Sequence, residues 1–211
     1  MTGDLQFDAA SHAFTWRGQP VPSVTQVLRD MGLQTNWFKD DPRYRERGSA
    51  VHLAAQLICE GVFDRDGTHP DLLPYTDGFE RFVADTGFRA LPGGEMPVYS
   101  ASLKLAGIPD MPGVMPGGQR WLLDIKTGEA APRGVELQLA LYRLMLGAAV
   151  DVNGEEVAME FNAVKCLLLP KSGQYRLIDC SDARWLKYAQ DAVGLWWLRK
   201  SWGLLNGREL T

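Results

Sequence analysis

The chain has 211 residues, of which 45% are hydrophobic and 23% charged, a composition typical of a globular protein with a substantial core. No apolar stretch approaches the length of a membrane span, and the N-terminus lacks the basic and apolar regions of a signal peptide, so we expect a cytoplasmic protein without membrane contact. The formal net charge of −4 excludes binding to nucleic acid through overall positive charge. Any such contact would need a local basic surface and bridging cations.

The cysteines fit a reducing compartment. The chain has three cysteines, an odd number, and none of them shows CxxC spacing: Cys59, Cys166 and Cys180. This pattern argues against a zinc site and against an iron–sulfur cluster.

The first half of the chain predicts a hairpin followed by helices. Residues 5–21 are expected to form two short strands around a polar turn. Pro22-Ser23 is a typical helix start, and the helix is expected to end near Gly32. The mixed-charge stretch 36–48 is expected to be irregular. Further helices are expected at 48–60 and, after a loop at 70–74, at 75–87.

The second half predicts a sheet with helices. Strands are expected at 95–107, 108–115, 119–128, 160–170 and 174–180, and helices at 134–147 and 182–202. The turn Pro116-Gly117-Gly118 should join the second and third of these strands as a hairpin. Without repeats, low-complexity tracts or a linker, residues 1–211 are expected to form one α/β domain, with an N-terminal helical region and a C-terminal helix.

The strand at 119–128 contains an aspartate and a lysine two residues apart. Asp124 and Lys126 share one face of the strand, while Leu123 and Ile125 point into the opposite apolar layer. Buried charges are costly unless they serve each other or a bound group. An isolated Asp-x-Lys tripeptide is more often a structural salt bridge, so the surrounding residues must decide its use.

A second carboxylate is expected beside this pair. Hairpin pairing can bring Asp110, in the sequence AGIPD, next to Asp124. Two close carboxylates are tolerable at neutral pH mainly when a divalent cation neutralises them, and magnesium accepts one or two carboxylates while keeping several waters. Lys126 could then orient a nucleophilic water or stabilise charge on a phosphate.

Two helices supply further polar residues. Gln138 and Tyr142 lie four apart on one face of the helix that follows the Asp124 strand. His52 follows Gly48 by four residues in RERGSAVHLAAQL. Taken alone, Gln138 is better explained as part of a polar helix surface, and His52 as a partly buried polar residue.

Together these motifs resemble the PD-(D/E)XK nuclease superfamily, in the branch of the RecB nuclease domain and phage-type exonucleases. The branch pattern is RG-[ST]-x-x-H, G-x-x-D, [DE]-x-K-[TS] and Q-x-x-x-Y, in that order. It matches here at Arg47–His52, Gly107–Asp110, Asp124–Thr127 and Gln138–Tyr142, over about half of the chain. The resemblance implies a restriction-endonuclease-like core, with a central mixed β-sheet flanked by helices.

The resemblance also implies roles for individual residues. Asp110 and Asp124 would be metal ligands together with the backbone carbonyl of Ile125, and Lys126 would assist the nucleophilic water. His52 would bind or support a second metal ion, and Glu95 is a further candidate ligand. Gln138 and Tyr142 would position the DNA backbone or the carboxylates. The cofactor would be Mg²⁺ or Mn²⁺, as one or two ions, without an iron–sulfur cluster.

Phosphate contacts near the site are expected from Lys39, Arg43, Arg45, Arg47, Ser49 and Arg133. Asp40, Asp41 and Glu46 reduce the local excess of positive charge, so a solvated loop explains these arginines about as well. Trp37 and Tyr44 could stack on bases, although core packing suits Trp37 better.

Pro109 cannot donate a ladder hydrogen bond, so the expected strand at 108–115 should be at an edge of the sheet or bulged at this residue.

The motifs therefore predict a metal-dependent deoxyribonuclease of the exonuclease type used by phages or in recombination. It would act on DNA in the cytoplasm of a bacterium or of a phage-infected host cell, as a homo-oligomer or with a recombination partner protein. An endonuclease with the same site and a non-catalytic DNA-binding module remain alternatives. A magnesium enzyme for small phosphate compounds would require a glycine-rich phosphate loop, and the sequence has no GxxxxGK[ST] or GxGxxG motif.

Overall fold

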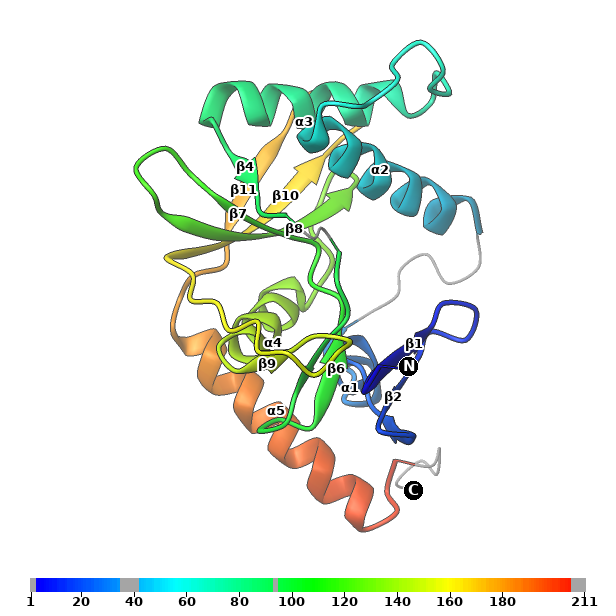
Figure 1. Cartoon of the computed structure of the whole chain (residues 1–211), viewed down its shortest axis with the longest axis vertical. Helices are drawn as coiled ribbons and strands as arrows, with labels where there is room; N and C mark the ends of the chain where they lie inside the picture. The colour runs from blue at the N-terminus through cyan, green and yellow to red at the C-terminus, as the bar shows by residue number, and fades with distance from the viewer. Residues whose placement is uncertain (1–2, 35–41, 93–94, 206–211) are drawn as a thin grey trace.

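A computed structural model describes residues 3–34, 42–92 and 95–205 of the chain (Figure 1). The strands are β1 (Leu5–Asp8), β2 (Ala13–Trp16), β3 (Gln19–Val21), β4 (Arg89–Ala90), β5 (Val98–Ser100), β6 (Leu105–Gly107), β7 (Met111–Val114), β8 (Arg120–Thr127), β9 (Ala149–Val150), β10 (Ala163–Leu169) and β11 (Arg176–Asp179). The helices are α1 (Val24–Asp30), α2 (Pro42–Glu60), α3 (Leu73–Thr86), α4 (Val135–Leu146) and α5 (Arg184–Ser201). Within these ranges, none of the helices is long and apolar enough to cross a bilayer.

The central sheet is mixed and has the strand order β11-β10-β8-β7-β4. Its middle strand β8 runs parallel to β10 and antiparallel to β7, so the predicted hairpin is confirmed. One face of the sheet, including Leu122 of β8, packs on α1, α4 and α5. The other face, including Leu123 and Ile125, packs on α2 and α3 (Figure 1). The chain is therefore an α/β protein whose mixed sheet is flanked by helices, as the sequence predicted.

Two smaller sheets join this core at one end. β1, β2 and β3 form one of them, and β6, β5 and β9 form the other. They meet through the stacked rings of Trp16 and Tyr99, whose centroids are 4.5 Å apart. The backbone amide of Ala106 also donates to the carbonyl of Pro22, just before α1. The start of α1 is thereby tied to the strand that precedes Asp110.

Several boundaries differ from those expected. The segment 95–107 forms a hairpin of β5 and β6 instead of one strand, because residues 101–104 make a turn. This turn contains neither glycine nor proline, which is why one continuous strand was predicted. Residues 42–47 were expected to be irregular but form the first turns of α2. Proline is tolerated at a helix start, and the arginines and glutamate that follow are good helix formers. β3, β4 and β9 have two or three residues each, too few for a periodic signal.

Pro109 lies where the chain passes from one sheet to another. β6 ends at Gly107 in one sheet, and β7 begins at Met111 in the central sheet. Pro109 therefore lies outside both strands and needs no ladder hydrogen bond, which removes the conflict that its missing N–H raised. Asp110 is the last residue before β7.

The start of α4 is held by a close backbone contact. Gly134 has φ of 87°, and a Cβ atom there would lie 2.2 Å from the carbonyl oxygen of Leu33. The loop that follows α1 thus lies directly against the first turn of α4. Only glycine gives both the positive φ and the space for this contact.

We expect Gly134→Ala to destabilise the fold by more than a positive φ alone explains. Gly117 has φ of 89°, and a Cβ atom there would meet nothing within 4 Å, so Gly117→Ala isolates the backbone strain, about 1–2 kcal/mol. Gly134→Ala adds the clash with Leu33. Urea unfolding of both variants measures the difference, and equal losses in free energy of unfolding would contradict the close contact.

Candidate functional site

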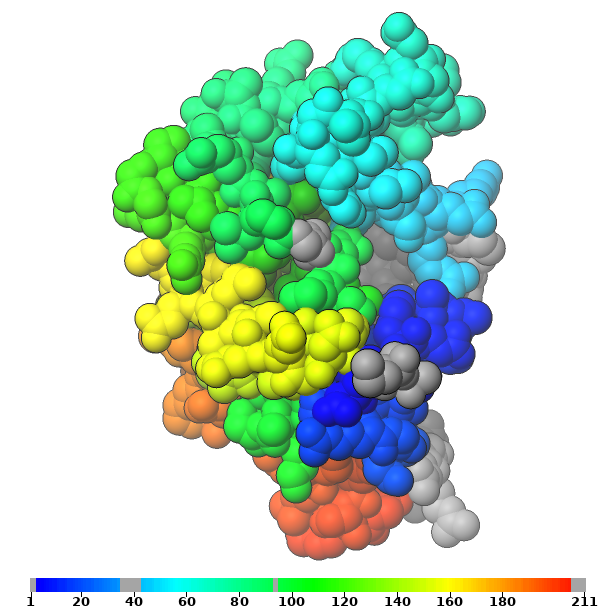
Figure 2. Space-filling model, viewed as in Figure 1, coloured from blue at the N-terminus to red at the C-terminus, as the bar shows by residue number. Residues whose placement is uncertain are grey.

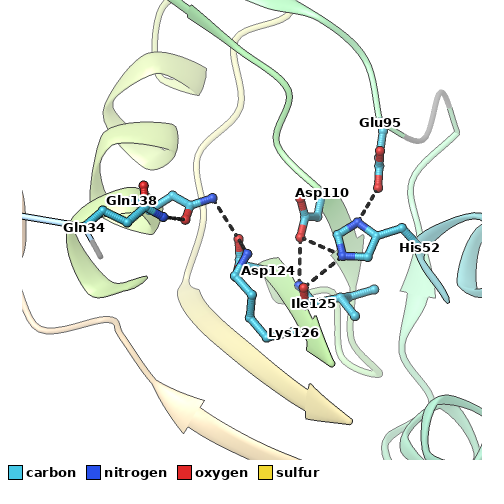
Figure 3. A network of polar contacts seen from close by, with 8 residues as sticks. All are labelled: Gln34, His52, Glu95, Asp110, Asp124, Ile125, Lys126 and Gln138. Atoms are coloured by element: carbon cyan, nitrogen blue, oxygen red, sulfur yellow. Dashed lines mark hydrogen bonds and ion pairs between the residues drawn. The ribbon is translucent and has the colours of Figure 1, made fainter. Parts of the chain in front are cut away.

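Polar side chains from six segments of the chain converge near the C-terminal end of β8 (Figure 3). Asp124 and Lys126 project from the face of β8 that is covered by α4, and Asp124 is only 1% exposed. His52 comes from α2 on the other side of the sheet. Because β8 is buried on both faces, its end can receive side chains from both helical layers.

Asp124 forms a buried ion pair with Lys126. The ammonium lies 2.8 Å from Oδ1 and 2.7 Å from Oδ2 of the carboxylate. Only the Oδ1 contact has hydrogen-bond geometry, so Oδ2 accepts no hydrogen bond from the described residues although the ammonium is near. A buried carboxylate oxygen with a free lone pair suits a further cation.

The pKa values of the pair follow from burial and from the neighbouring charges. Burial raises the pKa of Asp124 to about 6, against the opposing effect of Lys126. Burial would lower the pKa of Lys126, but the Asp124 and Asp110 carboxylates outweigh it and raise that pKa above its usual range. Lys126 is therefore a charged ammonium at neutral pH, not a free amine that could accept a proton.

Asp110 lies beside this pair but bonds to the backbone. β7 and β8 pair with Met111 opposite Leu123, which places Asp110 next to the end of β8. Its Oδ2 accepts a hydrogen bond of 2.8 Å from the amide of Ile125. The hairpin thus brings Asp110 to Asp124 as expected, and the backbone of β8 fixes its orientation.

His52 links Asp110 to Glu95. Its Nδ1 lies 2.7 Å from Oε1 of Glu95, and its Nε2 lies 2.9 Å from the carbonyl oxygen of Ile125 and 3.8 Å from Oδ2 of Asp110 (Figure 3). A carbonyl and a carboxylate can only accept, so both ring nitrogens carry protons in this arrangement. Burial opposes the charge, but Asp110 and Glu95 raise the pKa of His52 to about 9.

His52, Glu95 and Asp110 could hold a metal ion. One ligand atom from each of these residues lies within 4.8 Å of the other two, and the Ile125 carbonyl contacts the same histidine. Glu95 lies in the segment before β5, not on a strand as expected. Asp124 is outside this group of three and is bonded to Lys126 and Gln138. Cys59, Cys166 and Cys180 are free and form no cluster that suggests an iron–sulfur site.

Gln138 and Tyr142 of α4 cover the Asp124 side of the site. Both side chains are 5% exposed, and Gln138 Nε2 donates to Asp124 Oδ1 over 3.2 Å. A Cβ on Gly107 would lie 2.7 Å from the Tyr142 ring, so the glycine leaves room for the tyrosine. Burial and the charges of Asp110 and Asp124 raise the pKa of Tyr142, whose hydroxyl therefore stays protonated.

Gln34 is a further member of the site that sequence reasoning did not identify. Its Nε2 donates to Oε1 of Gln138 over 2.9 Å (Figure 3). With its oxygen occupied in this way, Gln138 can turn only its NH₂ group toward Asp124. The amides of Leu33 and Gln34 both donate to the carbonyl of Leu28, which fixes the loop. The two glutamines are 104 residues apart, so no local pattern could have indicated the contact.

The candidate phosphate-binding residues are dispersed along α2 and the loop before α4. Arg47 lies over the rings of Tyr44 and Tyr75, at 4.8 and 5.2 Å from their centroids, and so packs α2 against α3. The side chains of Arg43, Arg45, Ser49 and Arg133 are exposed. Lys39 and Trp37 lie outside the described residues.

Comparison with known proteins adds no assignment. The chain matches no known protein-family model, and no curated protein matches it in sequence. Its function must therefore be inferred from its motifs and from the geometry of this site.

We expect the His52 imidazole of the EDTA-treated protein to titrate near pH 9 instead of near 6.5. Since the folded pKa is raised, the protonated ring contributes stability that is complete below about pH 6.5 and is lost as the pH rises through about 9. Glu95→Gln removes a neighbouring carboxylate and should lower this pKa. Imidazole NMR across pH, assigned with His52→Gln, measures both values, and an unchanged pKa in Glu95→Gln would contradict the contact.

Gln34→Ala should destabilise the protein by about 1–3 kcal/mol, because it leaves the buried Oε1 of Gln138 without its partner. The matched control is Gln56→Ala, which removes an exposed amide hydrogen bond to Glu60 and should stay within about 0.5 kcal/mol of wild type. Chemical denaturation measures both changes. Equal stabilities of the two variants would show that the Gln34 contact contributes nothing.

Proposed function

We propose that this chain is a divalent-cation-dependent nuclease of the PD-(D/E)XK type that hydrolyses phosphodiester bonds in DNA, in the manner of the phage and recombination exonucleases. One observation carries the proposal: His52, Glu95 and Asp110 converge beside the Asp124–Lys126 pair at the end of the central strand. The four matching motifs lie on different helices, strands and loops, yet each contributes a side chain to this region. A chance occurrence of the motifs would not require them to meet.

The fold supports the same proposal. The hairpin of β7 and β8, the helix α4 that follows it, and the parallel strand β10 are the parts expected of a restriction-endonuclease-like core. In that core, the hairpin brings together the two aspartates and the next helix carries Gln138 and Tyr142. We assign the chain to this fold as part of the proposal.

The donor set suits a hard or borderline divalent cation. Carboxylate and carbonyl oxygens favour Mg²⁺ or Mn²⁺, and the imidazole of His52 adds a preference for Mn²⁺. Asp124 Oδ2 is buried and accepts no hydrogen bond from the described residues, although Asp124 is outside the group of three whose ligand atoms converge. When bound, such an ion would lower the pKa of a water and neutralise negative charge on the scissile phosphate.

The remaining residues have roles that follow from their charges. Lys126 remains an ammonium and would stabilise charge that develops on the phosphate oxygens. Asp124 holds that ammonium in place, and Gln138 orients Asp124. The protonated hydroxyl of Tyr142 can donate a hydrogen bond to a phosphate or to a carboxylate. His52 must lose its proton before Nε2 can act as a ligand.

Asp124→Asn and Lys126→Ala should each reduce cleavage at least ~100-fold, because each removes a charge on which the proposed chemistry depends. The assay uses linear and circular DNA, single- and double-stranded, with Mg²⁺, Mn²⁺ or EDTA. Cleavage restricted to linear DNA would identify an exonuclease, whereas cleavage of circles would identify an endonuclease with the same site.

The matched control is Asp179→Asn, which breaks an ion pair with Lys165 on the same sheet, and it should leave cleavage unchanged. Circular dichroism and thermal unfolding establish that each variant is folded. Wild-type rates in both site variants would refute the assignment of these residues. Absence of metal-dependent cleavage on every substrate, with DNA binding retained, would identify a non-catalytic module.

A further inference from the structure

A groove lies between the N-terminal sheet, α1, the start of α2 and the end of α5. Its volume is about 710 Å³, and it is lined by the β1–β2 turn, by Pro22, Ser23, Thr25 and Gln26, and by residues from three helices. Figure 2 shows the N-terminal strands (blue) next to the beginning of α2 (light blue). Both of these segments contribute residues that line the groove. None of the residues at the metal cluster lines it, so it is a separate feature of the surface.

The groove is positively charged although the chain as a whole is negative. Arg29 of α1, Arg45 of α2 and Lys200 of α5 line it, and no carboxylate does so among the described residues. None of these three cations forms an ion pair with any of the residues that the structure describes. Lys200 lies 4.9 Å from the ring centroids of Trp196 and Trp197, which restrict its position. Asp8 lies beside the groove, where it accepts hydrogen bonds from Ala10 and Ser11, but the three cations exceed this one carboxylate, so the groove suits an anionic ligand.

The groove is connected to the metal cluster by two helices. Arg45 precedes His52 by seven residues on α2, which puts both on the same face, about 10.5 Å apart along the helix axis. Arg29 lies five residues before Gln34, which reaches Gln138 at the site. Successive phosphates of one strand of a duplex are about 3.4 Å apart along its axis, so this separation corresponds to about three nucleotides.

We propose that this groove binds the sugar–phosphate backbone of one nucleic-acid strand, a few nucleotides away from the bond that is cleaved. Arg29, Arg45 and Lys200 contact phosphates there without reading sequence. The inference rests on the proposed nuclease function and extends it, because Arg29 and Lys200 belong to none of the motifs. A strand of a duplex and a free single strand present the same phosphates, and the experiment separates them.

The test is the double variant Arg29→Gln/Lys200→Gln of the full chain, compared with Arg81→Gln/Arg120→Gln, which removes the same charge from exposed sites outside the groove and the metal cluster. Binding of 5′-labelled 16-nucleotide single strands and of 16-base-pair duplexes is followed by fluorescence anisotropy in EDTA at several salt concentrations. The groove variant should bind at least ~10-fold more weakly, and its salt slope should fall by about one to two. The control variant should match wild type.

Cleavage with Mg²⁺ or Mn²⁺ provides the second measurement. A dinucleotide held at the metal cluster is too short to reach a groove about three nucleotides away, so the loss of kcat/KM in the groove variant should be at least ten times larger for the 16-mer than for the dinucleotide. A larger loss on single strands than on duplexes would identify the free strand as the ligand, and the reverse would identify the duplex.

The outcomes separate the two proposals. If wild type cleaves DNA and the groove variant binds and cleaves the 16-mer as well as the control variant does, the groove assignment is wrong and the nuclease assignment stands. If wild type binds DNA through the groove but cleaves no substrate, the nuclease assignment fails and the groove assignment stands. If wild type does not bind either 16-mer, the groove assignment is overturned.

Discussion

The structure depends on the balance of charge at the buried end of β8. Asp124 is almost fully buried, Asp110 lies beside it, and Glu95 approaches from the other side of His52. Carboxylates this close are costly without compensation, and the chain supplies an ammonium from Lys126 and an imidazolium from His52. Two positive charges then face three negative ones. Exchange of the histidine proton for a divalent cation would bring this sum to zero, which is consistent with a group of side chains that could hold such an ion.

The rest of the fold holds these charges in register. The two apolar layers on either side of the sheet fix β8, and its hairpin with β7 orients Asp110 against a backbone amide. Two glycines allow the close contacts: Gly107 leaves space for the Tyr142 ring, and Gly134 leaves space for the carbonyl oxygen of Leu33. The second of these contacts brings the end of α1 against α4. The orientation of Gln138, and through it that of Asp124, therefore depends on packing between helices as well as on the sheet.

The sequence predicted those parts of the site that follow from local periodicity. The two-residue repeat of a strand places Asp124 and Lys126 on one face, and the Pro-Gly-Gly turn predicts the hairpin that brings Asp110 near them. The partnership of His52 with Glu95 and that of Gln34 with Gln138 connect residues 43 and 104 positions apart, and tertiary packing alone determines them. The turn at 101–104 contains neither glycine nor proline, and Ser102 alone is too weak a turn signal to predict the β5–β6 hairpin.

The charge balance also bears on the order in which ligands would bind. Before a cation is present the cluster has an excess of negative charge, so it repels a phosphate, and the net charge of −4 adds to this repulsion. Arg45 of the groove lies about 10.5 Å from His52 along α2, slightly more than the Debye length of about 8 Å at physiological salt, so its attraction is weakened but still acts near the cluster. Under the proposed nuclease function, the groove cations would attract a strand before the cluster is neutralised. The scissile phosphate of the held strand would then add negative charge at the cluster and strengthen cation binding. By thermodynamic linkage, the cation would strengthen strand binding by the same factor.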